Sequence, residues 1–185
     1  SARSEAPCPA AAAPGAARPI EAERGCSSAS MTTTSPCAAG CGWTRTPENF
    51  RRDLETLYAR GYRLVSLGDL LDGRLAVPAG TTPVVLTFDD SSPGQFRYLE
   101  QNGTLEIDPK SAVGILEAFL RERPDFGRAA TFFVLPAADP PNRLFNQPAH
   151  AGKKLQYLVS RGYEIGNHTL WHANLGKYDE ATVRA

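Results

Sequence analysis

Apolar and polar positions along the chain alternate between two patterns. Short apolar or β-branched runs, typical of buried strands, occupy residues 83–88, 129–135 and 163–167. Apolar residues at helical spacing occupy residues 47–60, the end of 64–71, 112–120, 148–160 and a last segment from about residue 179. The repeated order of strand and helix predicts an α/β fold made of parallel βαβ units.

Residues with specific backbone roles refine these helices. Thr46, followed by Pro47, is expected to cap the first helix, and Asp108-Pro109 is expected to cap the helix before the second strand. The pair Lys153-Lys154 is interpreted as part of the solvated face of the helix over residues 148–160.

The first 42 residues differ from the rest. They are rich in Ala, Pro, Ser, Thr and Gly, with Ile20 and Met31 as the only large aliphatic side chains. Such a segment cannot bury enough surface to offset its chain entropy, so residues 1–42 are predicted to be a disordered, low-complexity tail. Residues 43–185 are then the folded domain. All four cysteines lie in the tail (Cys8, Cys26, Cys37 and Cys41), where three pairings into two disulfides are open.

Composition excludes several classes of protein. Twenty basic and twenty acidic residues give no net charge, so we expect no binding of nucleic acid by bulk electrostatics. The longest apolar runs, such as residues 132–135, are too short to cross a bilayer, and we expect no transmembrane segment in this chain.

Two of the predicted strands end in residues that can carry chemistry. Asp89-Asp90 follows the first strand, and His168 and His172 follow the third. Because parallel strands place their carboxyl ends on one rim, we expect these side chains to converge. Two imidazoles and one carboxylate make a three-ligand metal site with room for water, and the second carboxylate is placed to take the proton of that water. Taken singly, the Asp pair also fits a turn, and the histidines fit one face of a surface helix.

The same residues resemble the motifs of a known family. Leu86-Thr87-Phe88-Asp89-Asp90 resembles the first motif of the NodB-type polysaccharide deacetylases (carbohydrate esterase family 4). The segment His168-Thr169-Leu170-Trp171-His172 is similar to the family's second motif, and Ala130-Thr131-Phe132-Phe133-Val134 is similar to its core strand. The resemblance runs from about Thr44 to the end of the chain.

The resemblance implies a fold, an activity and roles for four residues. The fold is the NodB-type distorted (β/α) barrel, and the activity is metal-dependent removal of N-acetyl or O-acetyl groups from a cell-wall or extracellular polysaccharide. Asp89 is implied as the general base, and Asp90, His168 and His172 as ligands of a divalent metal. The metal is usually Zn²⁺, with Co²⁺ or Ni²⁺ as alternatives. An extracellular or cell-envelope location follows from the same likeness.

The chain departs from the family pattern in two places. Ser91 stands where the family has Gly after the Asp pair, and the segment 91–107 is longer and more polar than a minimal loop. In that segment, Phe96 and Tyr98 either stack on a sugar or pack the loop onto the domain. The family's orienting Arg and late acid His are expected beyond Ala185, so we expect a domain truncated after its third strand and weakly active or inactive by itself.

Two other functions are open on the sequence. One is a non-catalytic carbohydrate-binding or regulatory domain on the same scaffold. The other is an amidohydrolase that acts on a small non-sugar amide.

Overall fold

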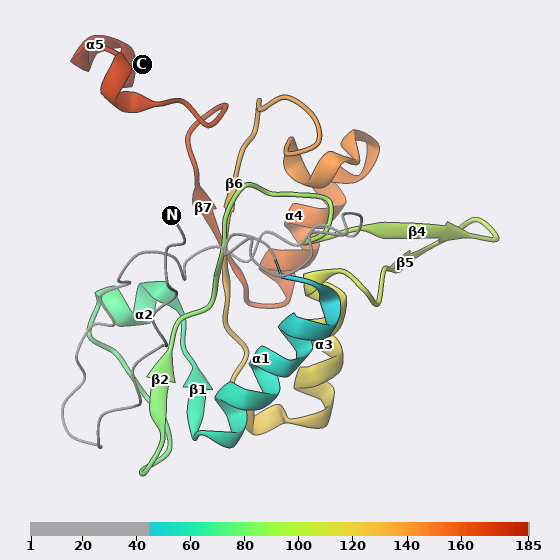
Figure 1. The fold of residues 1–185 in the computed structure, drawn as a ribbon, viewed down its shortest axis with the longest axis vertical. Helices are drawn as coiled ribbons and strands as arrows, with labels where there is room; N and C mark the ends of the chain where they lie inside the picture. The colour runs from blue at the N-terminus through green and yellow to red at the C-terminus, as the bar shows by residue number, and fades with distance from the viewer. Residues whose placement is uncertain (1–44, 185) are drawn as a thin grey trace, which may run out of the picture.

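The protein contains two sheets of parallel strands (Figure 1). The computed structural model describes residues 45–184. Strands β3 (Thr87–Phe88), β6 (Thr131–Val134) and β7 (Glu164–Asn167) form a parallel sheet in the order β3-β6-β7, and β1 (Tyr62–Leu64) pairs in parallel with β2 (Thr82–Val84). The predicted α/β class is therefore confirmed. Barrel closure stays a prediction, because the parallel strands of the described part form two separate sheets. The predicted tail and its four cysteines lie outside the described residues.

The strand predicted over residues 83–88 is two strands. Its first half, β2, pairs with β1, and its second half, β3, pairs with β6. The prediction of one continuous strand was wrong because the two halves bond to different neighbours. The segment thereby links the two sheets and delivers residue 89 to the rim of the larger one.

The helices lie close to their predicted positions. They are α1 (Pro47–Ala59), α2 (Leu67–Leu71), α3 (Ala112–Glu122), α4 (Ala151–Ser160) and α5 (Glu180–Arg184). Short 3-10 helices occupy Pro124–Phe126, Leu144–Asn146, Pro148–His150 and Leu175–Lys177. The predicted cap of α1 is confirmed, since Thr46 Oγ1 accepts a hydrogen bond from the Asn49 N–H at 3.2 Å. None of the helices in residues 45–184 has the length and apolar character that crossing a bilayer requires.

The cap of α3 differs from the prediction. Ser111 caps this helix, and its Oγ accepts from the Gly114 N–H at 3.2 Å. The predicted cap, Asp108, lies three residues too early, and its carboxylate instead binds the Arg97 guanidinium and the Lys110 N–H. The buried carboxylate thus ties the start of α3 to the segment before β4.

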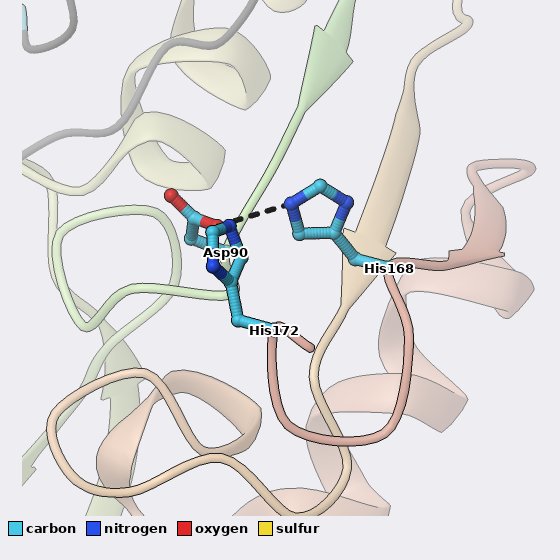
Figure 2. A group of neighbouring side chains, drawn as sticks. All are labelled: Asp90, His168 and His172. Carbon is cyan, nitrogen blue, oxygen red and sulfur yellow. Dashed lines mark ion pairs between the residues drawn. The ribbon is translucent and has the colours of Figure 1, made fainter. Parts of the chain in front are cut away.

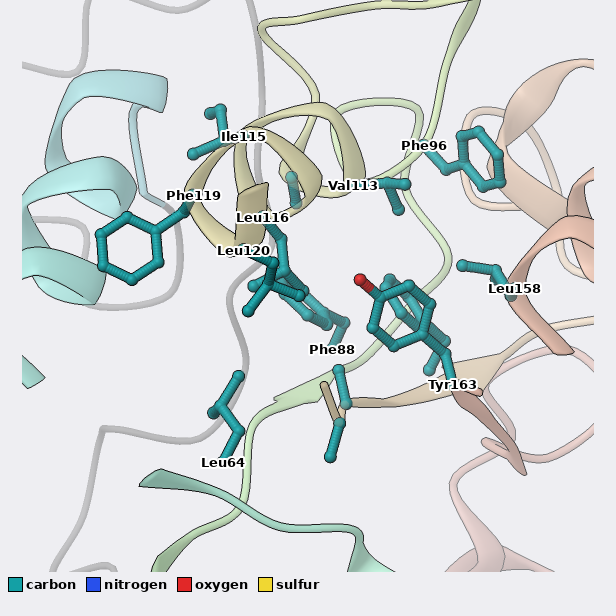
Figure 3. Packing of buried hydrophobic residues seen from close by; sticks show 14 of the residues in the cluster. Leu64, Phe88, Phe96, Val113, Ile115, Leu116, Phe119, Leu120, Leu158 and Tyr163 are labelled. Atoms are coloured by element: carbon teal, nitrogen blue, oxygen red, sulfur yellow. The ribbon is translucent and has the colours of Figure 1, made fainter. Parts of the chain in front are cut away.

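Aromatic and aliphatic side chains fill the space between the sheet and α3 (Figure 3). Leu116 and Leu120 point from α3 toward Phe88 on β3, and all three are buried. The ring of Phe88 also stacks on that of Phe132, with 4.6 Å between centroids. Burying each such side chain stabilises the fold by about 1.5–3 kcal/mol. This core holds β3 and β6 in place, and with them the residues that follow β3.

An antiparallel hairpin was missed by the sequence analysis. Strands β4 (Tyr98–Gln101) and β5 (Thr104–Ile107) pair across a tight turn at Asn102-Gly103, where both residues have positive φ. Asn-Gly between two short strands is the usual signal of such a turn and could have revealed the hairpin. Phe96, just before it, is fully buried in the core, so the packing interpretation of this residue is confirmed.

Lys154 corrects another expectation. Lys153 is exposed, as predicted, but the Lys154 side chain is completely buried. Its Nζ donates to the carbonyl oxygens of Phe96 at 2.8 Å and Phe145 at 3.2 Å. The interpretation of both lysines as a solvated face was wrong because the long side chain reaches two backbone acceptors that helical spacing cannot reveal.

Candidate metal centre

The first part of the site is the turn that follows β3. Phe88 anchors the end of the strand in the core, and Asp89 and Asp90 come next, both half-buried. The backbone carbonyl of Asp89 accepts a hydrogen bond from the Gln95 side-chain amide. Asp90 adopts the left-handed conformation, with φ of 73°. The turn therefore leaves the strand direction at once and keeps Asp90 near the rim of the sheet.

The second part is the loop after β7. His168 comes directly after the strand, and its N–H donates to the Val134 carbonyl at the end of β6. Residues 168–172 form a loop and not the helical face that their four-residue spacing suggested. Positive φ angles at Thr169 and His172 turn the chain back, and Thr169 Oγ1 accepts from the Ala173 N–H at 3.1 Å. The loop therefore brings both imidazoles to one side.

The two parts meet at Asp90 (Figure 2). Asp90 Oδ1 lies 3.2 Å from His168 Nε2 and 3.4 Å from His172 Nε2. One ligand atom from each of the three residues lies within 4.8 Å of the other two. The side chains of Asp90 and His168 are 27% and 31% exposed, whereas that of His172 is 65% exposed, so the cluster opens to solvent on the His172 side.

The donor set fits a divalent cation. Ligands of a tetrahedral zinc ion lie about 2.0–2.2 Å from the metal, which places them about 3.4 Å from one another. The two distances from Asp90 Oδ1 to the imidazole nitrogens agree with that spacing. Asp90 Oδ1 is also buried and makes no hydrogen bond. Leaving a buried carboxylate oxygen without a partner is costly, and a cation held between Asp90, His168 and His172 removes that cost.

Asp89 lies beside this cluster but is not one of its three members. Burial raises the pKa of the Asp89 carboxyl, and the charge of Asp90 adds to the rise, while His168 and His172 act in the opposite direction. A carboxylate with a raised pKa is a better proton acceptor than an exposed one. Asp89 is therefore suited to accept a proton, and the three residues beside it are suited to bind a cation.

The structure brings together the four residues singled out from the sequence, whose roles stay predictions. Two neighbouring residues of the loop differ in their surroundings. Thr169 binds the backbone of its own loop, and Trp171 is 49% exposed. Sequence reasoning missed the contribution of Ser91, which is completely buried directly after Asp90. The only signal was the departure from the family's Gly at that position.

Comparison with known proteins gives one result. The family model described as polysaccharide deacetylase matches residues 76–185, more than half of the chain, and the match includes all four site residues. A search of curated proteins and a search of solved structures found no match. On the strength of the family match and of the motifs at the strand ends, the chain belongs to the polysaccharide deacetylase family.

Proposed function

We propose that this protein is a metal-dependent hydrolase that removes N-acetyl or O-acetyl groups from a cell-wall or extracellular polysaccharide. One observation carries the metal dependence: the buried Asp90 Oδ1, which makes no hydrogen bond, faces the Nε2 atoms of His168 and His172. Family membership supports the deacetylase chemistry and the polysaccharide substrate. A substrate of this kind would be met at the cell envelope or outside the cell, and we propose that location for the protein.

Asp90, His168 and His172 would hold the cation. A mixed set of one oxygen and two imidazole nitrogens suits Zn²⁺, and Co²⁺ and Ni²⁺ accept the same donors. When bound, such a cation supplies Lewis-acid polarisation of the acetyl carbonyl and makes nearby water more acidic. The exposed edge of His172 leaves one side of the site accessible to substrate.

Asp89 would act as the general base. It is adjacent to Asp90 in the chain, and its raised pKa favours proton uptake from the attacking water. The hydrogen bond from Gln95 to the Asp89 carbonyl fixes the backbone at this residue. Asp89 and Asp90 thus divide two tasks, proton transfer and metal binding, between neighbouring carboxylates.

Acetate release from N-acetylated and O-acetylated oligosaccharides by the full-length protein tests the proposal. Chelator should abolish release, and added Zn²⁺ should restore it. Asp89→Asn should lower the rate about 100-fold or more while the protein still binds Zn²⁺. His150→Ala is the matched control, because His150 is outside the cluster. Acetate release that is insensitive to chelator would contradict the metal mechanism, and turnover of small amides alone would favour the amidohydrolase alternative.

A further inference from the structure

The turn that carries Asp90 has an unusual backbone. Asp90 and Ser91 are consecutive residues in the left-handed region, with φ of 73° and 41°. For residues with a side chain, this conformation costs roughly 1–2 kcal/mol each. Contacts outside the turn must therefore hold it in shape, and with it the position of the Asp90 carboxylate.

Ser91 makes three such contacts. Its side chain is completely buried, and its Oγ donates to the Asn142 carbonyl at 2.8 Å and accepts from the Leu135 N–H at 3.0 Å. The Ser91 carbonyl accepts from the Phe145 N–H at 2.8 Å. Ser91 therefore ties the Asp90 turn both to the end of β6 and to the segment that precedes α4.

The Phe145 segment needs support of its own. Leu144, Phe145 and Asn146 have φ of 42°, 64° and 50°, three left-handed residues in succession. Lys154 supplies that support from α4, because its Nζ donates to the Phe145 carbonyl at 3.2 Å. The same nitrogen donates to the Phe96 carbonyl at 2.8 Å, so one side chain joins two segments that flank the turn.

Lys154 is an unusual choice for a buried position. Within residues 45–184, its Nζ donates to two carbonyl oxygens and to no carboxylate. Burial and the charge of Arg97 lower the pKa of Lys154 to about 7. An apolar side chain could fill this volume but could not bind those carbonyls.

We propose that Lys154 is a positioning residue for the metal ligand Asp90 and acts through hydrogen bonds from its Nζ to Phe145 and from Phe145 to Ser91. The proposal rests on the metal centre described above. Without the Lys154 donor, the left-handed segment around Phe145 relaxes, and the Ser91 carbonyl loses its fixed partner. The Asp90 carboxylate then samples more positions, and the cluster binds its cation less tightly.

Replacement of each of two adjacent lysines tests this role in the full-length protein. Lys154→Met keeps the length of the side chain but removes its donors, and Lys153→Met makes the same change at the exposed neighbour. We expect Zn²⁺ affinity, measured by competition with a chelating dye, to fall 10- to 100-fold for Lys154→Met and to change less than twofold for Lys153→Met. The absorption spectrum of bound Co²⁺ should change for Lys154→Met only.

A second variant, Ser91→Ala, changes the turn directly. Ser91→Ala removes the side-chain contacts of the turn and should weaken Zn²⁺ binding about tenfold. Ser91→Ala removes the Oγ contacts but keeps the carbonyl that Phe145 binds. If both variants loosen the same turn, the double variant should lose less affinity than the product of the single losses. Wild-type Zn²⁺ affinity in folded Lys154→Met, or in Lys154→Leu should Lys154→Met not fold, would overturn the proposal. Absence of Zn²⁺ binding by the wild-type protein would instead overturn the metal centre.

Discussion

Two carboxylates in this protein, Asp90 and Glu117, are each approached by basic side chains, with different outcomes. Glu117 on α3 is 5% exposed and receives hydrogen bonds from Arg161 at 2.7 Å, Tyr163 at 2.8 Å and Arg128. Asp90 Oδ1 is also buried but makes no hydrogen bond, although two imidazoles approach it.

The two carboxylates differ in the hydrogen-bond donors that the approaching side chains offer. Arginine and tyrosine bring N–H and O–H donors, so they satisfy Glu117 directly. An imidazole nitrogen that carries a lone pair accepts and does not donate, so a carboxylate oxygen that faces two such nitrogens is suited to share a cation with them. The first cluster is complete and stabilises the fold, whereas the second is suited to a cation. Whether a buried carboxylate receives hydrogen bonds therefore distinguishes the structural cluster around Glu117 from the candidate functional cluster around Asp90.

The largest effect is expected at Asp90. Asp90→Asn removes the charged ligand and should lower Zn²⁺ affinity by at least about 100-fold, because ligands contribute more than the groups that orient them. The free energy of unfolding of the metal-free protein should not fall, since no hydrogen bond of Asp90 Oδ1 is lost. Chelator-dye competition and urea unfolding measure the two quantities. Unchanged Zn²⁺ affinity would show that Asp90 is not a ligand.

Replacement of Glu117 should lower stability and leave Zn²⁺ affinity unchanged, the opposite of Asp90→Asn. Glu117→Gln leaves the partly exposed guanidinium groups of Arg128 and Arg161 without their counter-ion and should lower the free energy of unfolding by about 1–3 kcal/mol. Zn²⁺ affinity of the folded variant should stay within about twofold of wild type, because Glu117 is not in the Asp90 cluster. A large loss of Zn²⁺ affinity without loss of stability would remove the distinction between the two clusters.

A smaller effect on the free energy of unfolding is expected when the pH is lowered. Burial acts to raise the pKa of Glu117, but hydrogen bonds from Arg161 and Tyr163 and the charges of Arg128 and Arg161 outweigh it, and the pKa lies below its usual value of 4.5. The stabilisation is therefore present above about pH 4.5 and is lost as the pH falls through the folded-state pKa. Urea unfolding between pH 6 and pH 3 should show a steeper loss for wild type than for Glu117→Gln. Parallel curves would contradict the lowered pKa.

Much of the architecture was predictable because it depends on local patterns. The helices α1, α3 and α4 and the strands β6 and β7 lie where periodicity and β-branched runs indicated. The parallel arrangement followed from their order along the chain. Because parallel strands end on one rim, the sequence also indicated that residues 89–90 and 168–172 would be neighbours, nearly 80 positions apart.

Other features depend on contacts between segments that sequence patterns do not encode. The helical spacing of Lys154 says nothing about two carbonyl oxygens that other segments bring within its reach. The same holds for the division of residues 82–88 between two sheets and for the left-handed turn at Ser91, which is held by backbone groups of distant residues.

The sequence by itself therefore determined the order of the elements and the chemical groups at the strand ends, because residue type and local period suffice for both. Only the tertiary structure decided that one oxygen of Asp90 faces both imidazoles and that a buried lysine supports the segment beside it. Distances of a few ångströms between remote side chains arise from the packing of the whole core, and that packing is not a property of any single segment.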